Sequence, residues 1–201
     1  DDMCLPGCSD DTSLPNLDIW GAQLYQGCTF ISAFNQYASY DDCDRPLVLT
    51  EFGSDAYDSR DPGEDQAYQA DCLGTLLGEA ESRLAVRSAS GVSSGHIVFE
   101  WADEWWKANP DADNPDNTCV EGETAWDQHD SCASFNNFAY PDWEQQEEWW
   151  GVVTNNPADE TDRGLRTSYT TMSEVYQLGD VCNMEVTSFD DLSGEATLSF
   201  D

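Results

Sequence analysis

The stretch PLVLTEFG at residues 46–53 decides the fold. An apolar run of this length, bounded by Pro46 and Gly53, predicts a buried β-strand. Glu51 stands late in this strand, where a carboxylate costs free energy to bury unless it has partners or a function. The ordinary alternative is a structural carboxylate, paired with a nearby arginine or capped by backbone N–H groups.

Two similar apolar stretches flank this strand, at residues 17–25 (LDIWGAQLY) and 95–101 (GHIVFEW). Between the three stretches, apolar residues recur at helical spacing in residues 30–40 and 64–89. Alternating strands and helices, with strands that are apolar throughout, predict a parallel sheet in an α/β protein.

Each predicted strand carries a polar or aromatic side chain at its carboxyl end. These are Tyr25 on the first strand, Glu51 on the second, and Glu100 with Trp101 on the third. In a (β/α)8 barrel that end of the strands forms the active face, so we expect the four residues to lie together.

The rest of the chain is predicted as a long loop, a closing helix and a pair of strands. Residues 102–148 form the loop, which a disulfide is expected to tie down, and residues 166–178 form the helix. Residues 183–201 alternate like two strands, the start of a β-type appendage. The expected domains are therefore residues 1–182, part of a barrel, and residues 183–201.

The charge of the chain excludes several classes of function. Acidic residues number 41 against 7 basic ones, for a net charge of −34. Such a chain repels nucleic acids and anionic lipids, and no apolar run reaches the roughly 18 residues of a membrane span. The 12% aromatic content is typical of a folded protein rather than an acidic disordered tract. An acidic surface suits a salty or extracellular medium, so a secreted protein is expected.

The eight cysteines predict a disulfide framework rather than zinc, because they form no C-x-x-C pair and only two histidines are present. Local loops favour the pairs Cys4–Cys8, Cys28–Cys43 and Cys119–Cys132, with Cys72–Cys182 closing a long loop. The acidic run DADNPDN at residues 111–117 lacks the glycine and bidentate glutamate of an EF-hand, so no metal is predicted. The start DDMCLPG has no signal peptide, which suggests a mature product or an internal fragment.

Three motifs carry a resemblance to a known family. PLVLTEFGSDAYD resembles the seventh-strand motif of clan-A retaining glycoside hydrolases, in the β-glucanase, glucanosyltransferase and β-galactosidase-like branches. DIWGAQLYQGCTF is similar to the sixth strand, with Gln23 where the family usually has Asn, and HIVFEWADEWWK is similar to the eighth. The resemblance implies that Glu51 is the nucleophile, that Tyr25 orients it by a hydrogen bond, and that Trp101 forms the floor under the sugar. The candidate substrate-binding residues are Trp20, Gln23, Glu100, Trp101 and Trp105.

The resemblance also defines what this chain is expected to contain. The family's acid/base glutamate lies on the fourth strand, whereas only residues 1–16 precede the sixth-like strand here. The expected fold is therefore the carboxyl-terminal part of a (β/α)8 barrel, strands six to eight. The implied function is that of a secreted retaining glycoside hydrolase or transglycosylase, without a cofactor, acting on β-glucan or a related polysaccharide. Its expected partners are a polysaccharide or oligosaccharide, together with the rest of its own barrel or other matrix proteins.

A second hypothesis comes from a different class of protein. Dense cysteines, extreme acidity and the missing acid/base fit an inactive structural or carbohydrate-binding protein of an extracellular matrix or surface appendage, built on a hydrolase-like barrel. Under either hypothesis the paired tryptophans 105, 106, 149 and 150 form a platform for a glycan or hydrophobic filling beneath the long loop.

The catalytic hypothesis makes one geometric prediction. The hydroxyl oxygen of Tyr25 is expected about 2.5–3.0 Å from a carboxylate oxygen of Glu51, in a pocket lined by Trp101.

Overall fold

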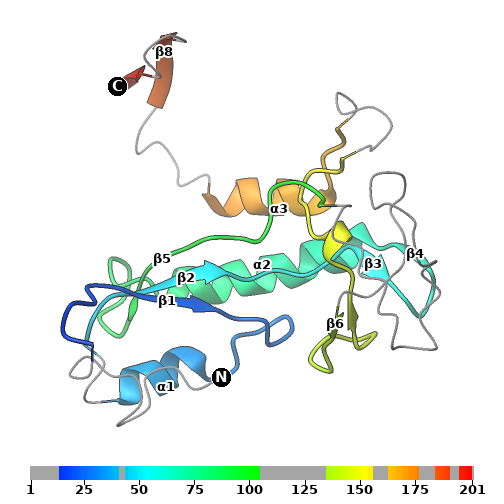
Figure 1. Ribbon diagram of the computed structural model, residues 1–201, viewed down its shortest axis with the longest axis horizontal. Helices are drawn as coiled ribbons and strands as arrows, with labels where there is room; N and C mark the ends of the chain where they lie inside the picture. Colours follow the sequence, from blue (N-terminus) through cyan, green and yellow to red (C-terminus); the bar gives the residue numbers. More distant parts are fainter. Residues whose placement is uncertain are drawn as a thin grey trace.

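A computed structural model describes six segments of the chain: residues 14–40, 44–104, 135–155, 163–176, 184–190 and 195–200. Its centre is a parallel sheet of three strands in the order β1 (Trp20–Gln23), β2 (Leu47–Glu51) and β5 (Ser93–His96). Figure 1 shows the sheet with α1 (Ala33–Ser39) and α2 (Gln66–Ser82), which connect successive strands. The expected α/β fold with adjacent parallel strands is confirmed, and β2 with its Glu51 lies in the middle.

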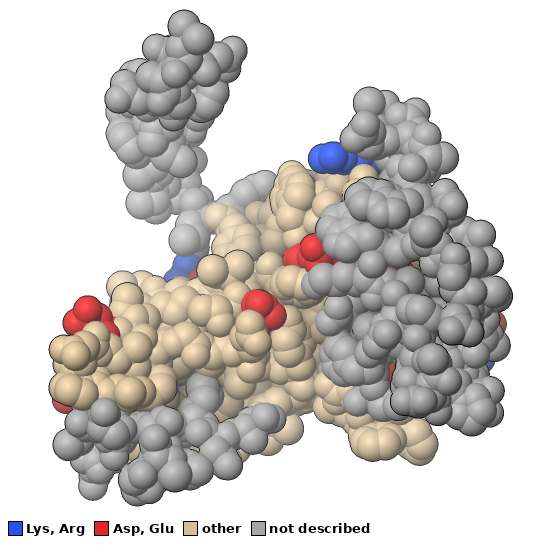
Figure 2. All heavy atoms as spheres, in the orientation of Figure 1, with Lys and Arg blue, Asp and Glu red and all other residues tan. Residues whose placement is uncertain are grey.

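The remaining elements lie outside this three-stranded sheet. They are β3 (Tyr57–Asp58), β4 (Gly63–Glu64), β6 (Phe135–Asn136), β7 (Glu144–Gln145), the 3-10 helix η2 (Glu147–Trp149), α3 (Thr167–Tyr176), β8 (Met184–Asp190) and β9 (Glu195–Phe200). Strands β8 and β9 pair antiparallel, which confirms the two strands expected in residues 183–201. On the face drawn in Figure 2, acidic side chains of the described residues are scattered among uncharged ones. Within the described segments, no helix is long and apolar enough to cross a bilayer.

Helix α2 is shorter than the predicted span of residues 64–89. It begins after Asp65, whose carboxylate accepts a hydrogen bond from the Tyr68 N–H at 2.9 Å, as an N-cap residue does. It ends at Ser82 because the chain then turns back on itself, with the Ser93 N–H bonded to the Arg83 carbonyl at 3.0 Å. Gly91 allows this turn, since a Cβ there would lie 2.4 Å from the Leu84 carbonyl oxygen.

The other boundaries also differ from the prediction. Strand β1 is confined to the middle of residues 17–25, and β5 begins before residue 95 and ends at His96. The segment beyond β5 stays beside β2 through single backbone bonds, from Ile97 N–H to the Leu49 carbonyl and from Phe99 N–H to the Phe52 carbonyl, each 2.9 Å. The strand therefore ends where the regular pattern of backbone hydrogen bonds stops, although the two segments remain side by side.

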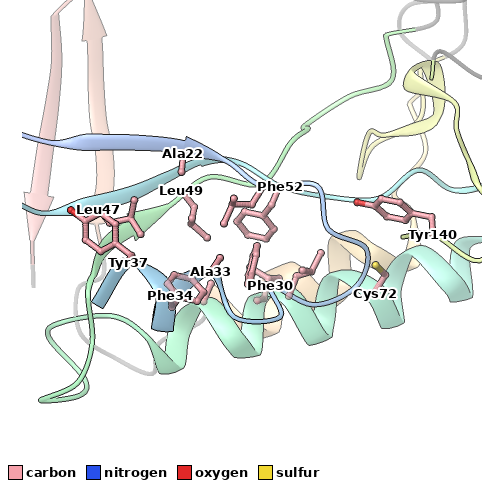
Figure 3. Packing of buried hydrophobic residues seen from close by; sticks show 14 residues of the cluster. Ala22, Phe30, Ala33, Phe34, Tyr37, Leu47, Leu49, Phe52, Cys72 and Tyr140 are labelled. Carbon is pink, nitrogen blue, oxygen red and sulfur yellow. The ribbon is translucent and has the colours of Figure 1, made fainter. Parts of the chain in front are cut away.

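The core lies between the sheet and the two helices (Figure 3). Leu47 and Leu49 of β2 are fully buried there. They belong to one cluster with the aromatic residues of α1 and of the segment just before it, and with Leu76 and Leu77 of α2. Phe30 contacts Phe52 edge to face, with ring centroids 5.2 Å apart. Burying side chains of this size contributes about 1.5–3 kcal/mol each, so this layer holds the sheet in place.

A bulge near the end of β2 sets the direction of Glu51. Ala22 pairs with Leu49, but the next residue, Gln23, pairs with Glu51, so Thr50 is an extra residue on β2. Strict alternation would place Glu51 on the face of Leu47 and Leu49, towards the core. The extra residue moves Glu51 to the face of Gln23 instead, as β-bulges do, and the following Phe52 returns to the core.

The described disulfide differs from the predicted pairing. Cys28 bonds to Cys72 of α2, with their Cα atoms 4.7 Å apart, so neither Cys28–Cys43 nor Cys72–Cys182 is correct. The segment after β1 packs directly on α2, where Thr29 and the Phe30 N–H both bond to Glu79 at 2.6 and 2.9 Å. This packing brings the two cysteines together. The other six cysteines, including those of Cys4–Cys8 and Cys119–Cys132, lie outside the described residues.

The end of the predicted loop 102–148 is structured. Strands β6 and β7 form a short antiparallel hairpin, and η2 follows it. Tyr140, between the two strands, is fully buried and donates a hydrogen bond to the Gly53 carbonyl at 2.8 Å. The hairpin is thus fastened to the chain just beyond β2, near Glu51.

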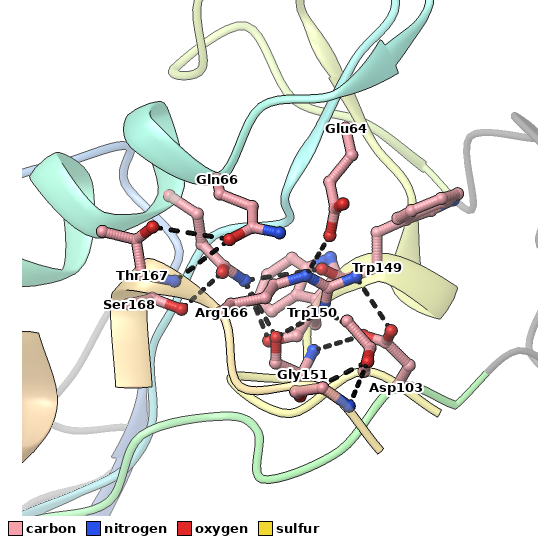
Figure 4. Close-up of polar contacts among 12 residues, drawn as sticks. Glu64, Gln66, Asp103, Trp149, Trp150, Gly151, Arg166, Thr167 and Ser168 are labelled. Carbon is pink, nitrogen blue, oxygen red and sulfur yellow. Dashed lines mark hydrogen bonds and ion pairs between the residues drawn. The ribbon is translucent and has the colours of Figure 1, made fainter. Parts of the chain in front are cut away.

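A buried ion-pair network joins the segment after β5 to α3 (Figure 4). Arg166 bonds through both terminal nitrogens to the carboxylate of Asp103, and through Nε to Glu64 at 2.6 Å. The Gly151 N–H donates to Asp103 at 3.0 Å, and the Gly151 carbonyl accepts from Arg166 at 2.6 Å. Asp103 therefore has a structural role in fixing three segments together.

Candidate active site

The site is built around the carboxylate of Glu51, at the carboxyl end of the central strand. Tyr25 donates its hydroxyl to Oε2 at 2.8 Å, which confirms the predicted hydrogen bond. Gln23 donates its side-chain amide to Oε1 at 2.7 Å, so each carboxylate oxygen accepts one neutral donor. The two donors come from β1 and the residues just after it, and fix the plane of the carboxylate.

This arrangement bears on the ordinary alternative for Glu51. Among the described residues, no arginine or lysine forms an ion pair with this carboxylate; its hydrogen-bond partners are Tyr25 and Gln23. The backbone carbonyl of Glu51 accepts the Leu24 N–H at 2.9 Å, which continues the β1–β2 pairing past the bulge. The carboxylate is therefore oriented by neutral groups without being neutralised by a cation.

Trp150, which sequence reasoning did not assign as a partner of Tyr25, contacts this pair through the tyrosine ring. Trp150 contacts Tyr25 edge to face, with centroids 5.0 Å apart, and contacts Phe99 at 5.6 Å. Only 1% of Trp150 is exposed, so it packs behind Tyr25 and has no face for a sugar. Of the two roles considered for this tryptophan, hydrophobic filling is the one that the structure supports.

The other predicted binding residues are not all brought to Glu51. Trp101 is 57% exposed and contacts Tyr169 of α3, with ring centroids 5.8 Å apart. Glu100 is half-buried, and its carbonyl accepts the Val152 N–H at 3.1 Å. Trp20 pairs with Leu47 at the amino end of β2, so it lies at the opposite end of the sheet. Trp105 lies outside the described residues.

A second carboxyl group, Asp55, lies four residues beyond Glu51 and is fully buried. Burial raises its pKa well above the usual 3.8, and nearby Asp142 and Asp58 add to the rise, although the Gln146 N–H at 2.7 Å opposes it. Sequence reasoning missed this residue, because a carboxylate in a polar loop is ordinarily exposed. Across the described residues, no group of three or more acidic, histidine or cysteine side chains is arranged to hold a metal ion.

Replacing Asp55 by asparagine is expected to raise the free energy of unfolding at pH 7. A raised pKa means that the folded state keeps the proton longer, so stability falls as pH rises from about 4 through the folded pKa. An asparagine can still accept the Gln146 N–H and has no charge to bury. Urea unfolding of the whole protein from pH 4 to pH 8 should show the advantage growing with pH.

A matched control for this experiment is Asp58→Asn. Hydrogen bonding to Arg60 lowers the pKa of Asp58 to about 2, so its neutralisation should not stabilise the protein at pH 7. An Asp55→Asn variant that loses stability towards neutral pH relative to the parent would contradict the expectation.

Removing the Tyr25 hydroxyl is expected to lower kcat about ten- to a hundredfold while changing KM much less. A hydrogen bond to a charged group contributes about 1.5–3 kcal/mol, and if Glu51 has the predicted role of nucleophile, this bond would orient a group that bonds to the substrate only in the transition state. Steady-state kinetics of Tyr25→Phe in the whole protein measures both constants. Tyr40→Phe, at the end of α1, is the control and should leave both constants unchanged. An orienting role would be refuted if Tyr25→Phe raised KM by as large a factor as it lowered kcat.

Comparison with known proteins gives only partial structural similarity. No family model matches the sequence, and no curated protein does. A GH2 beta-galacturonidase from Eisenbergiella tayi is 14% identical, over 81% of this chain and 24% of that one, with a TM-score of 0.44. A beta-glucuronidase from Ruminococcus gnavus is 14% identical, over 83% and 23%, with a TM-score of 0.40. A beta-glucuronidase from Bifidobacterium dentium is 13% identical, over 79% and 20%, with a TM-score of 0.40. The chain thus spans about a quarter or less of these enzymes.

Proposed function

We propose that this chain provides the nucleophile side of a retaining glycoside hydrolase or transglycosylase that acts on β-glucan or a related polysaccharide. The observation that carries the proposal is the carboxylate of Glu51, held by Tyr25 and Gln23 at the carboxyl end of a central parallel strand. An acidic, disulfide-containing chain fits a secreted enzyme that works outside the cell.

The geometry suits nucleophilic attack for a chemical reason. A carboxylate oxygen offers two lone-pair directions, and here each oxygen uses one of them for Tyr25 or Gln23. Among the described residues, no other side chain occupies the second direction on either oxygen. Neutral donors fix the orientation, yet they leave the negative charge that attack on an anomeric carbon requires.

The reaction would proceed in two steps. A Glu51 oxygen bonds to the anomeric carbon while the glycosidic bond breaks, and the leaving oxygen takes a proton from a second carboxyl group about 5–5.5 Å away. The resulting glycosyl ester is then attacked by water or by a sugar hydroxyl, which loses its proton to the same group. The family resemblance assigns that acid/base to a fourth strand, ahead of the part of the barrel that this chain resembles.

Covalent trapping tests the proposal directly. Whole protein is incubated with activated 2-deoxy-2-fluoro β-glycosides of glucose, galactose and glucuronic acid, whose ester intermediates break down slowly. We expect one adduct by intact mass, mapped by peptide sequencing to Glu51 and missing in Glu51→Gln. An adduct on another residue would overturn the proposal, and so would a Glu51→Gln variant that turns these glycosides over as fast as the parent.

A further inference from the structure

The hairpin between β6 and β7 exposes two adjacent aromatic rings. Phe138 is 78% exposed and Trp143 is 59% exposed, and their rings meet edge to face with centroids 5.7 Å apart. Side chains of this size usually contribute to a core, and neighbouring exposed ones mark a contact surface. The core of the described residues uses neither of them.

The backbone holds Trp143 in an unusual conformation. Its φ is +67°, a region that bulky residues seldom occupy and that costs about 1–3 kcal/mol. The conformation is fixed by the Trp143 N–H, which bonds to the Tyr140 carbonyl at 3.1 Å, and by the Trp143 carbonyl, which accepts the Asn137 N–H at 3.0 Å. The turn thus keeps the indole on the outside at a cost in free energy.

The two rings stand on a firmly anchored loop. Tyr140, which lies between Phe138 and Trp143 in the sequence, is buried, and its hydroxyl donates a hydrogen bond to the Gly53 carbonyl at 2.8 Å. Asp142 accepts hydrogen bonds from the Ser59 N–H and hydroxyl at 3.2 and 3.1 Å. A surface fixed in this way loses little conformational entropy when it binds a ligand.

The same loop touches the candidate active site. Asn137 donates its side-chain amide to the Tyr25 carbonyl at 3.1 Å. Ala139 lies so close to Gly27 that a Cβ there would be 2.4 Å from the Ala139 carbonyl oxygen. Figure 1 shows the hairpin beyond the ends of β1 and β2 to which their arrows point. The hairpin therefore lies at the same end of the sheet as Glu51.

From these observations we infer that Phe138 and Trp143 form a binding subsite for an uncharged β-linked polysaccharide that extends from the site at Glu51. The apolar face of a pyranose ring stacks on an exposed aromatic ring such as the indole of Trp143. With 41 acidic residues against 7 basic ones, the chain disfavours an anionic glycan. The inference rests on the proposed function for the direction of the glycan, but the binding step can be measured separately.

Affinity electrophoresis of the whole protein in the Glu51→Gln background makes that measurement, because bound glycan is then not consumed. Native gels contain laminarin, or an anionic polysaccharide of similar length as a comparison. We expect laminarin to retard the parent protein. Trp143→Ala and Phe138→Ala should each raise the dissociation constant for laminarin about tenfold. Trp143→Phe, which keeps a ring, should recover part of the loss. Val86→Ala removes another exposed apolar side chain and is the control.

Four results would overturn the inference. They are no retardation of the parent by laminarin, stronger retardation by the anionic polysaccharide, unchanged retardation of Trp143→Ala, and conversion of a dimer to a monomer by Trp143→Ala in sedimentation. The last would assign the rings to a second copy of the chain. Failure of covalent trapping at Glu51 would leave these binding results unaffected, so the two proposals fail separately.

Discussion

Replacing Glu51 by glutamine is expected to lower the turnover of β-glycosides by about four orders of magnitude or more, the scale seen when a nucleophile is removed. The amide has the shape of the carboxylate and still accepts one of the two hydrogen bonds from Gln23 and Tyr25. It lacks the negative charge that the proposed attack on the anomeric carbon requires. Initial rates with nitrophenyl β-glycosides and laminarin measure the loss, and Glu174→Gln on α3 is the surface control.

A shorter side chain sharpens this test. In Glu51→Ala, a small anion such as azide can enter the vacated space and attack the anomeric carbon, which releases an activated leaving group as its anion. The product is then an α-glycosyl azide, of inverted configuration, while the parent yields a retained β-product. Nuclear magnetic resonance of the products distinguishes the two. Residual activity of Glu51→Ala with retention and without azide would show that Glu51 is not the nucleophile.

The largest expected effect on stability follows from removing Arg166. The change Arg166→Leu leaves the buried carboxylate of Asp103 without its cation, and breaking a buried pair in this way costs about 3–5 kcal/mol. The change also removes the hydrogen bond that Arg166 donates to the Gly151 carbonyl, and this bond holds the segment after η2 in place. Urea unfolding of the whole protein measures the change in free energy.

The control for this change is Arg60→Leu. Arg60 is paired with Asp58 at 2.8 Å but its side chain is 57% exposed, so its loss should change the free energy of unfolding far less than the loss of Arg166. The double variant Arg166→Leu with Asp103→Leu should be less destabilised than the sum of the single variants, because no unpaired charge is left. Strict additivity would mean that the two side chains do not act as a pair.

Much of the sheet and part of the site could be predicted from the residues alone. Apolar strands separated by helical spacing imply parallel pairing, and carboxyl ends of parallel strands meet at one edge. That reasoning places Tyr25 beside Glu51, and the hydrogen bond between them is present. Trp20, expected among the substrate-binding residues, lies instead at the other edge of the sheet, away from Glu51, because it stands at the start of β1.

The features that could not be predicted depend on tertiary packing. The pairing of Cys28 with Cys72 arises because the chain after β1 lies on α2, whereas the shortest-loop argument considers only distance along the chain. Strands β6 and β7 contain two residues each, too few to show alternation. The burial of Asp55 likewise results from Gln146 and Tyr140 closing over a polar loop.

The bulge opposite Gln23 makes one residue of β2 dispensable for the direction of Glu51. Ala22 pairs with Leu49 and Gln23 pairs with Glu51, so Thr50 is left over in this register. Without Thr50, the glutamate would directly follow Leu49, and regular alternation would still place it on the face of Gln23. Substitution of Thr50 and in-frame loss of its codon should therefore both be tolerated over generations of mutation and selection. Among relatives that keep this site, sequence drift and single-residue gaps at this position should both be common.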